Sequence, residues 1–323
     1  MSASVELQLS EFALDVAEGL SLPGQKKLQP RYFYDDLGST LFEAITLLPE
    51  YGLMRADERI LRRHARDIAS AVGPLKLVAE LGSGSGRKTA PVLHALREGS
   101  PGFDPFLYRP IDISETALIS CDKELSNTAE VKIVCADWLD GLAEVARERN
   151  SISPLLLLFL GSSIGNLDRS SIVEFLERVR SLLLPGDFFL LGADLVKDRE
   201  RMIAAYDDAL GVTAAFNLNL LSRMNRELGA NFDLREFAHQ ARWNEAGRRI
   251  EMHLLAKRRQ RVFINCLEMA FQFTAGETIW TESSHKFTED ELRSYAWGSG
   301  FRPVESWTDL EWPFTEMLWR AEP

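Results

Sequence analysis

The chain has 323 residues, of which 46% are hydrophobic, 26% charged and 10% aromatic, a balance that excludes a disordered or fibrous protein. Its 37 Lys and Arg residues against 48 Asp and Glu residues leave a net charge of −11, with histidine neutral. A nucleic acid or an anionic membrane is therefore not an expected partner, because phosphate binding normally requires a basic excess.

Cysteines, histidines and apolar runs exclude further classes of site. Cys121, Cys135 and Cys266 lie far apart, and the five histidines form no close pair with the spacing of metal ligands. We therefore expect neither a disulfide framework nor a bound metal. The N-terminus does not resemble a secretion signal, and the longest apolar run, residues 155–160, is far too short to span a membrane. These features predict a cytoplasmic protein.

Short apolar runs predict buried parallel strands in the first half of the chain. Each run leads into a glycine or an acidic residue, and they cover residues 75–81, 106–113, 131–135 and 154–160. A helix is predicted over residues 88–97. Asp168 can cap a second helix, which Pro185 and Gly186 end before a fifth strand over residues 188–191. This alternation predicts a doubly wound α/β sheet that binds its ligands at the carboxyl ends of the strands.

The pattern changes after about residue 196. Long amphipathic or mixed segments precede strand-like runs, and the four segments are residues 202–226, 234–243, 249–255 and 262–273. Near the C-terminus the sheet is expected to resume, with a capped helix over residues 288–298 and strands over residues 304–307 and 314–319.

These elements predict two domains. The core comprises residues 59–195 and 287–323, and the second domain comprises residues 1–58 and 196–286. The N-terminal residues are too few to fold alone, so we expect them to pack with the inserted segment.

A glycine-rich turn over residues 80–86, with the sequence ELGSGSG, follows the first predicted strand. Glycines let the backbone turn tightly and approach a ligand. Asp112, at the end of the second strand, can accept hydrogen bonds from both hydroxyls of a ribose, and Asp137 can accept one from the amine of an adenine. The turn alone could serve a dinucleotide or merely connect two elements. Together the three features favour a nucleoside site.

The spacing of the glycines separates two kinds of cofactor. Gly82, Gly84 and Gly86 form G-x-G-x-G after an acidic residue, Glu80, whereas dinucleotide enzymes have G-x-G-x-x-G. This turn resembles the S-adenosylmethionine (SAM) turn of class I methyltransferases. The resemblance implies a Rossmann-like sheet that ends in a reversed hairpin, with Glu80 stabilising the loop or the amino-acid end of the cofactor. A nicotinamide oxidoreductase is the less favoured alternative.

Six segments outside this turn carry a second resemblance. They are RYFYDDLGS at 31–39, LPEY at 48–51, GSSIGN at 161–166, AYDD at 205–208, RIEM at 249–252 and TESSHKF at 281–287. Together they resemble the histidine Nα-methyltransferases of ergothioneine biosynthesis, from about residue 30 to the C-terminus. The resemblance implies SAM-dependent methylation of the α-amine of L-histidine, up to N,N,N-trimethylhistidine (hercynine).

The same resemblance implies roles for residues that would bind the amino-acid end of histidine. Tyr51 and Asn166 would hold the α-carboxylate and the α-amine, with Tyr34 and Tyr206 assisting, and we expect Asn166 and Tyr34 to be catalytic. Tyrosine hydroxyls and an amide can bind a zwitterion without adding a cation beside the positively charged sulfonium.

At the other end of the substrate, Glu282 and Ser284 would hydrogen-bond the imidazole, and Met252 would pack near it. A carboxylate that accepts from an imidazole N–H discriminates against analogues that leave it unpaired. The resemblance also places SAM on eight residues of the turn and the strand ends, namely Glu80, Gly82, Ser83, Gly84, Lys88, Asp112, Asp137 and Trp138.

Two alternatives remain open. After Tyr51 this chain has Gly52, Leu53 and Met54, where the common family form has Tyr-Pro-Thr, so a related N-methyltransferase for another amino acid is the nearest one. A catalytically silent SAM-binding protein is the other. In each case we expect a monomer whose partners are small molecules.

Overall fold

The computed structural model describes residues 10–99, 106–149 and 153–323, and it divides into two compact units. The core unit comprises Gly52–Lys197 and His285–Pro323, and the insert unit comprises Met1–Tyr51 and Asp198–Ser284. Residues 1–9 of the predicted N-terminal segment lie outside the described residues. The domain boundary expected after residue 58 falls within helix α3 (Gly52–Val72), and the units divide at the start of this helix.

The core unit contains a mixed sheet with the strand order β13-β14-β7-β6-β2-β3-β4, in which β5 also pairs with β3. The strands are β2 (Leu77–Leu81), β3 (Leu107–Asp112), β4 (Glu130–Val131), β5 (Val134–Cys135), β6 (Leu155–Phe159), β7 (Phe188–Asp194), β13 (Phe301–Asp309) and β14 (Phe314–Ala321). Strands β2 to β7 pair in parallel, whereas β14 runs antiparallel to both β7 and β13. The predicted α/β fold class with a terminal reversed hairpin is confirmed.

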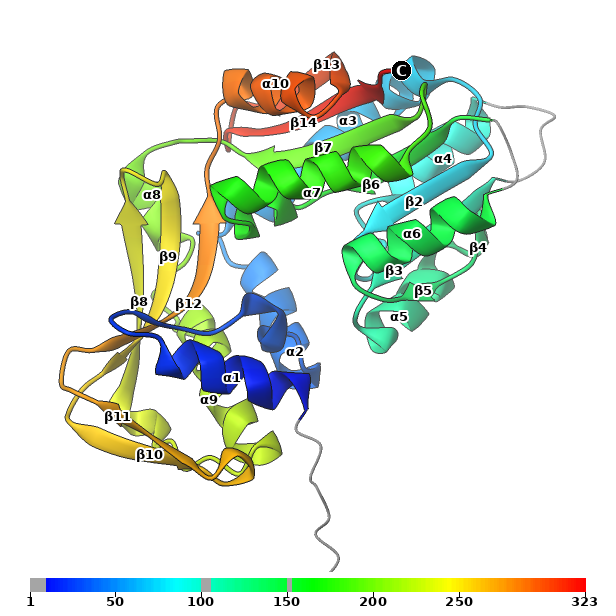
Figure 1. Ribbon diagram of the computed structural model, residues 1–323. Coiled ribbons are helices and arrows are strands. Elements are labelled where there is room, and N and C mark those ends of the chain that lie inside the picture. The colour runs from blue at the N-terminus through cyan, green and yellow to red at the C-terminus, as the bar shows by residue number, and fades with distance from the viewer. Residues whose placement is uncertain (1–9, 100–105, 150–152) are drawn as a thin grey trace, which may run out of the picture. The chain divides into compact units, whose positions relative to one another are not determined.

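Helices cover both faces of this sheet (Figure 1). Helices α6 (Trp138–Glu148) and α7 (Arg169–Leu182) lie on one face, and α3 and α4 (Ala90–Glu98) lie on the other. Helices α5 (Glu115–Leu125) and α10 (Glu289–Gly298) complete the unit. Strands β6 and β7 are buried along their whole length, as expected of strands that helices cover on both faces.

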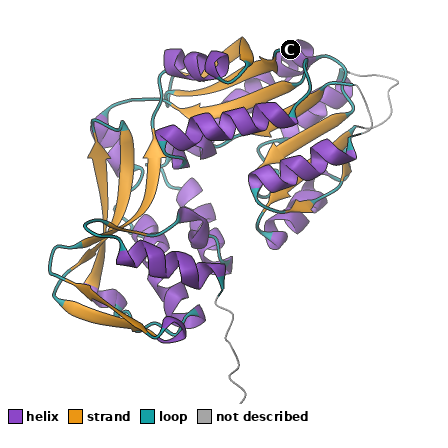
Figure 2. Ribbon diagram, in the orientation of Figure 1, coloured by secondary structure: helices purple, strands orange, loops and turns teal. Residues whose placement is uncertain are grey.

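The insert unit combines a four-stranded sheet with helices (Figure 2). Its strand order is β1-β12-β9-β8, and a separate hairpin pairs β10 with β11. The strands are β1 (Lys26–Lys27), β8 (Phe237–Asn244), β9 (Arg249–Ala256), β10 (Gln260–Ile264), β11 (Met269–Phe273) and β12 (Thr278–His285). The helices are α1 (Glu11–Ser21), α2 (Asp36–Thr46), α8 (Arg199–Ala204) and α9 (Val212–Glu227), with short 3-10 turns η1 (Pro30–Phe33), η3 (Leu234–Glu236) and η4 (Asn265–Leu267).

Four predicted elements differ from the structure. The run over residues 262–273 is a hairpin, because η4 and a left-handed Glu268 (φ 52°) turn the chain. Residues 202–226 form two helices, since the Asp208 carboxylate accepts hydrogen bonds from the N–H groups of Val212 and Thr213 and starts α9 anew. Residues 131–135 are divided between β4 and β5, and most of the mixed segment 234–243 is strand β8.

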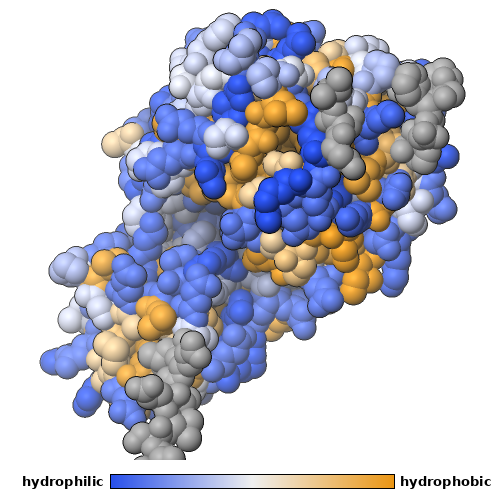
Figure 3. All heavy atoms as spheres, turned by 45° about the vertical axis from the view of Figure 1, so that its right-hand side comes forward, coloured by the Kyte–Doolittle hydropathy of each residue, from blue (hydrophilic) through white to orange (hydrophobic). Residues whose placement is uncertain are grey.

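The surface agrees with the composition. Hydrophilic side chains cover most of the face that Figure 3 shows, and groups of hydrophobic residues lie between them. None of the helices in the described ranges is long and apolar enough to cross a membrane.

Candidate active site

The glycine-rich turn after β2 has the backbone geometry that only glycine adopts readily. Gly84 and Gly86 have φ angles of 54° and 72°. A Cβ on Gly86 would lie 2.6 Å from Cys121 Sγ of α5, so this glycine is required by packing. A Cβ on Gly84 would meet no protein atom within 4 Å. The backbone at Gly84 therefore faces open space, where a ligand can approach it closely.

Asp112 joins the end of β3 to this turn. Its Oδ2 accepts a hydrogen bond from Gly84 N–H at 3.0 Å, and its Oδ1 accepts one from Ser114 N–H at 2.9 Å. The side chain remains partly exposed. Its lone pairs are therefore directed beside the turn, as a ribose-binding carboxylate requires.

The start of α6 borders the same turn. Asp137 is the N-cap of α6, and its exposed carboxylate accepts from Leu139 N–H at 3.3 Å. The next residue, Trp138, packs on Phe159 with ring centroids 4.9 Å apart. A Cβ on Gly82 would lie 3.3 Å from Trp138 Nε1. The structure thus brings the start of α6 next to the glycine turn, where the sequence predicts a nucleoside.

Glu80 supports the turn from below. Its side chain is fully buried, and its carboxylate accepts hydrogen bonds from Thr89 Oγ1 at 2.8 Å and from Tyr108 OH at 2.5 Å. Burial raises the pKa of Glu80 to about 7, although the charge of Lys88 and these hydrogen bonds oppose the shift. Of the two roles expected for Glu80, these contacts favour stabilisation of the loop.

Asn166 lies in a short 3-10 turn, η2 (Ser163–Asn166), that follows β6. This segment is held firmly, because the N–H of Asp194 donates to Ser162 Oγ at 2.9 Å. A Cβ on Gly165 would lie 2.9 Å from the carbonyl oxygen of His285, so the turn also packs closely on the backbone at the end of β12. Asn166 itself is partly exposed and so accessible to a ligand.

A buried ion cluster next to this turn has no counterpart in the predicted site. Asp194 is fully buried, its Oδ2 lies 2.8 Å from Lys286 Nζ, and its Oδ1 accepts from Trp312 Nε1 at 2.9 Å. Burial alone would raise the pKa of Asp194, but Lys286 and Lys197 outweigh it and hold that pKa below its ordinary value. The cluster fixes the end of β7, from which the Asp194 N–H reaches Ser162.

In the insert unit, the predicted substrate tyrosines lie in one aromatic cluster. The rings of Tyr51 and Tyr206 meet edge to face, with centroids 5.9 Å apart. Phe42 links Tyr51 to Tyr34, with centroid distances of 6.4 Å and 5.7 Å. Such edge-to-face contacts fix the planes of the rings and therefore the directions of their hydroxyl groups.

The cluster continues to strand β12 through a hydrogen bond. Tyr206 OH and Ser284 Oγ lie 2.7 Å apart, and both side chains are buried. Glu282 precedes Ser284 by two residues on the same strand, so the two side chains point to the same face. Glu282 is partly exposed. A hydroxyl pair and a carboxylate are thus presented beside three tyrosines.

Met252 lies on the neighbouring strand β9. Its side chain is 2% exposed, and its carbonyl oxygen accepts a hydrogen bond from Thr281 Oγ1 at 3.0 Å. Thr281 Oγ1 also lies 2.8 Å from Asn217 Oδ1 of α9, so its one proton lies between two acceptors, and Asn217 Nδ2 donates to the carbonyl of His253. Asn217 therefore ties β9 and β12 together, a role that the sequence did not suggest.

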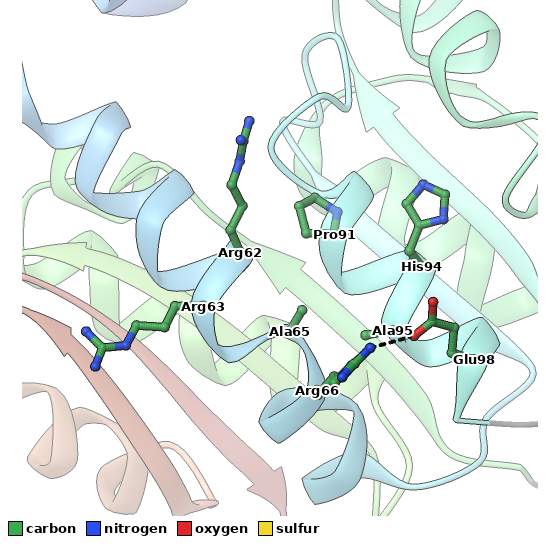
Figure 4. A pocket seen from close by; sticks show the side chains of 8 residues that line it. All are labelled: Arg62, Arg63, Ala65, Arg66, Pro91, His94, Ala95 and Glu98. Atoms are coloured by element: carbon green, nitrogen blue, oxygen red, sulfur yellow. Dashed lines mark ion pairs between the residues drawn. The ribbon is translucent and has the colours of Figure 1, made fainter.

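A hollow of another kind lies between α3 and α4, where Figure 4 shows a largely basic lining. Arg62, Arg63 and His94 line it, and Arg66 pairs with Glu98 at 3.5 Å. Both members of that pair are well exposed, so the pair contributes little energy. None of the predicted site residues lines this hollow.

Comparisons with known proteins agree with the geometry. The family described as "Histidine-specific methyltransferase, SAM-dependent" matches residues 12–321. Histidine N-alpha-methyltransferase of Mycobacterium tuberculosis (strain CDC 1551 / Oshkosh) is 43% identical over 297 residues, which are 91% of this chain and 90% of that protein. The protein of the same name from Mycolicibacterium smegmatis is 42% identical over 300 residues, 91% of this chain and 90% of that protein. Ergothioneine biosynthesis protein 1 of Neurospora crassa is 30% identical over 294 residues, 88% of this chain and 32% of that protein.

Proposed function

This chain belongs to the histidine-specific, SAM-dependent methyltransferases, and we propose how its residues divide the work of the reaction. It methylates the α-nitrogen of L-histidine with SAM as the methyl donor, in ergothioneine biosynthesis. The assignment of individual residues below is our proposal.

Residues of the core unit are proposed to bind the cofactor. The ribose would bind to Asp112, the adenine to Asp137 and Trp138, and the amino-acid end to the turn around Gly84 and to Lys88. The open side of Gly84 and the free lone pairs of Asp112 support this assignment, because both leave room for a nucleoside beside the turn. Ser83 and Gly82 complete the turn, and Glu80 holds it in place.

Residues of the insert unit are proposed to select histidine. The observation that best supports this is the hydrogen bond between Tyr206 and Ser284, together with the ring contact between Tyr206 and Tyr51. Three distant segments of the chain supply these residues, and their side chains are in contact in the folded protein. Glu282 and Ser284 would bind the imidazole, and Met252 would form a wall beside it.

Positioning is proposed to supply most of the rate enhancement. Bound SAM supplies an electrophilic methyl group, and the nucleophile is the neutral α-amine of histidine. Such an amine has a reference pKa of about 8, so it must lose a proton before each transfer. Tyr51, Tyr34 and Asn166 would orient it with neutral groups that do not compete with the cationic donor. Alignment of two reactants can lower the barrier by about 7 kcal/mol or more.

We propose that the product is N,N,N-trimethylhistidine, formed in three transfers. Each methyl group makes the nitrogen head larger without adding a hydrogen-bonding demand, and Asn166 is partly exposed and so able to accommodate this growth. We also propose that the protein acts in the cytoplasm as a monomer and binds no nucleic acid, in line with its net charge of −11.

Gly52 shows why the departure after Tyr51 need not change the substrate. A Cβ on Gly52 would lie 2.2 Å from the indole of Trp312, so this indole occupies the space of any larger side chain. Trp312 also donates to Asp194 at 2.9 Å. The glycine is thus explained by packing within the core unit.

The test is incubation of the protein with SAM and an equimolar mixture of the twenty amino acids, followed by tandem mass spectrometry. We expect methyl groups on the α-nitrogen of histidine, with trimethylhistidine as the final product. Methylation of a different amino acid, or of the imidazole ring, would contradict the proposal. Accumulation of the monomethyl form alone would reject the three-transfer part of it.

A further inference from the structure

Two buried carboxyl groups in the core unit have no part in the site described above. Asp57 lies on α3 and Glu316 on β14, and both side chains are 0% exposed. Three oxygens of this pair, Asp57 Oδ1 and both Glu316 oxygens, find no hydrogen-bond donor among the described residues. Buried acceptors normally have a donor, so these three oxygens require an explanation.

The backbone around this pair is shaped to make room for it. Glu316 pairs with Gly192 of β7, and a Cβ on Gly192 would lie 2.4 Å from Glu316 Oε1. A side chain at position 192 would therefore displace the Glu316 carboxyl from its observed place. A fully buried carboxyl over a glycine is a built feature of the sheet, because an apolar side chain would fill the same space without desolvating a charge.

The fourth oxygen of the pair makes two contacts that lead to the active site. Asp57 Oδ2 accepts a hydrogen bond from Gly161 N–H at 2.9 Å and lies 3.4 Å from Lys88 Nζ. Gly161 begins the segment that carries Asn166. A Cβ on Gly161 would lie 2.8 Å from Lys88 Nζ, so the ammonium group packs directly on this glycine.

Electrostatics determines how the two carboxyls can coexist. Two ionised carboxylates in contact and out of water would repel each other strongly, and one proton between them removes that repulsion. Burial, and then contact with Asp57, raise the pKa of Glu316 well above its ordinary value. Glu316 is therefore the member that carries the proton. Its O–H supplies the donor that Asp57 Oδ1 otherwise lacks, and the pair keeps one negative charge.

We propose that Asp57 and Glu316 share one proton and act as a positioning pair, which holds Lys88 Nζ and the Gly161 N–H in place for catalysis. The negative charge on Asp57 fixes the ammonium of Lys88, and Glu316 fixes Asp57 without adding a second charge. This inference depends on the cofactor role proposed for Lys88. It adds two residues, from α3 and β14, that would act on SAM affinity without touching SAM.

The test compares variants of Asp57, Glu316 and Lys88 with the wild-type protein by calorimetric titration of S-adenosylhomocysteine (SAH) and by steady-state kinetics. Asp57→Asn should weaken SAH binding at least tenfold and raise the KM for SAM, with the KM for histidine changed less than threefold. Glu316→Gln, whose amide can donate to Asp57, should stay within threefold of wild type. Glu316→Leu lacks the donor, so its affinity for SAH should fall at least fivefold. When Asp57→Asn is added to Lys88→Met, the affinity for SAH should not fall below that of Lys88→Met alone.

Asp187→Asn is the matched control, because Asp187 is also buried in the core unit and pairs with Arg149. It should lower the melting temperature and leave SAH affinity unchanged. Equal losses in Glu316→Gln and Glu316→Leu, or an Asp57→Asn protein that binds SAH like wild type, would overturn the inference. The Glu316 contrast decides the matter even if Asp57→Asn does not fold. If Lys88→Met alone binds SAH normally, the cofactor role proposed for Lys88 has failed instead.

Discussion

The core unit and the insert unit hold their candidate residues in different ways. In the core unit, the candidate residues follow strand ends, and backbone groups help to define the site, as in the bond from Gly84 N–H to Asp112. In the insert unit, the candidate residues are side chains from distant segments, and ring contacts and one hydroxyl pair bring them together. A backbone turn can be identified from a short motif, whereas a set of side chains requires the whole tertiary structure.

This difference predicts two separable kinds of defect. Changes in the insert unit should alter the choice of substrate and leave cofactor affinity intact, and changes at the proposed cofactor residues of the core unit should do the reverse. The core unit also contains fully buried acidic side chains. They are Asp57, Glu80, Asp194 and Glu316, all 0% exposed. Its stability should therefore depend more steeply on pH.

Glu282→Ala should have the largest effect. Without the carboxylate, the imidazole N–H has no charged acceptor, and we expect kcat/KM for histidine to fall by about a thousandfold. SAH affinity, measured by calorimetry, should change less than twofold. Glu282→Gln keeps an acceptor oxygen, so its kcat/KM for histidine should lie between those of the wild type and Glu282→Ala. A comparable loss of SAH affinity in Glu282→Ala would remove the distinction between the units.

Gly84→Ala tests the core side of the comparison. Its φ of 54° strains any other residue by about 1–3 kcal/mol, and the new methyl group enters the space proposed for the cofactor. We expect SAH affinity to fall by about 30-fold, with the KM for histidine little changed. Gly186→Ala carries similar strain at φ 94° in a turn outside the site. It should lose stability alone, and equal losses of affinity in both variants would count against the proposed cofactor contact.

Tyr206→Phe should have a smaller effect on histidine. It removes the hydroxyl that meets Ser284 Oγ, a contact of about 1 kcal/mol, so the KM for histidine should rise about fivefold. Ser284→Ala should lose more than this, because it also removes a proposed imidazole partner. The losses in the double variant should be less than additive. Tyr32→Phe, whose hydroxyl donates to Asp15 outside the cluster, is the matched control and should not change the KM. Additive losses would show that the two residues act independently.

The pH dependence of stability should show the smallest change. Glu80 titrates near pH 7 in the folded protein and at about 4.3 when unfolded, so the folded state binds more protons between these values. The free energy of unfolding should therefore fall as the pH rises from about 5 to about 7. In Glu80→Gln the fall in melting temperature over this pH range should be smaller by a few degrees. The fall that remains should come from Glu316. Parallel curves for the two ligand-free proteins in thermal scans would contradict this.

Most of the core sheet could be predicted because its strands are continuous apolar runs, such as β6 (Leu155–Phe159). Strand β12 (Thr278–His285) could not be predicted in the same way, since polar side chains interrupt its apolar pattern. The turn at Glu268 could not be predicted either, because a non-glycine residue with positive φ has no clear signature in sequence.

The same reasoning explains which polar residues were missed. Asp57 lies among Leu53, Ala56, Ile60 and Leu61 on the buried face of α3. A carboxylate at the centre of an apolar helical stripe indicates a buried acid, and residues 52–72 show this pattern. Glu316 has a similar signal, with buried neighbours on both sides along β14. The contacts that explain these two acids, with Gly161, Lys88 and Gly192, join segments too distant for any local pattern to connect.

The most direct test of the account is a crystal structure with SAH and L-histidine bound. We expect the imidazole within hydrogen-bond distance of Glu282 and Ser284, the α-amine facing Asn166, and the ribose hydroxyls on Asp112. Histidine bound with its ring away from Glu282, with that carboxylate in open solvent, would contradict the central claim that the insert unit selects the substrate.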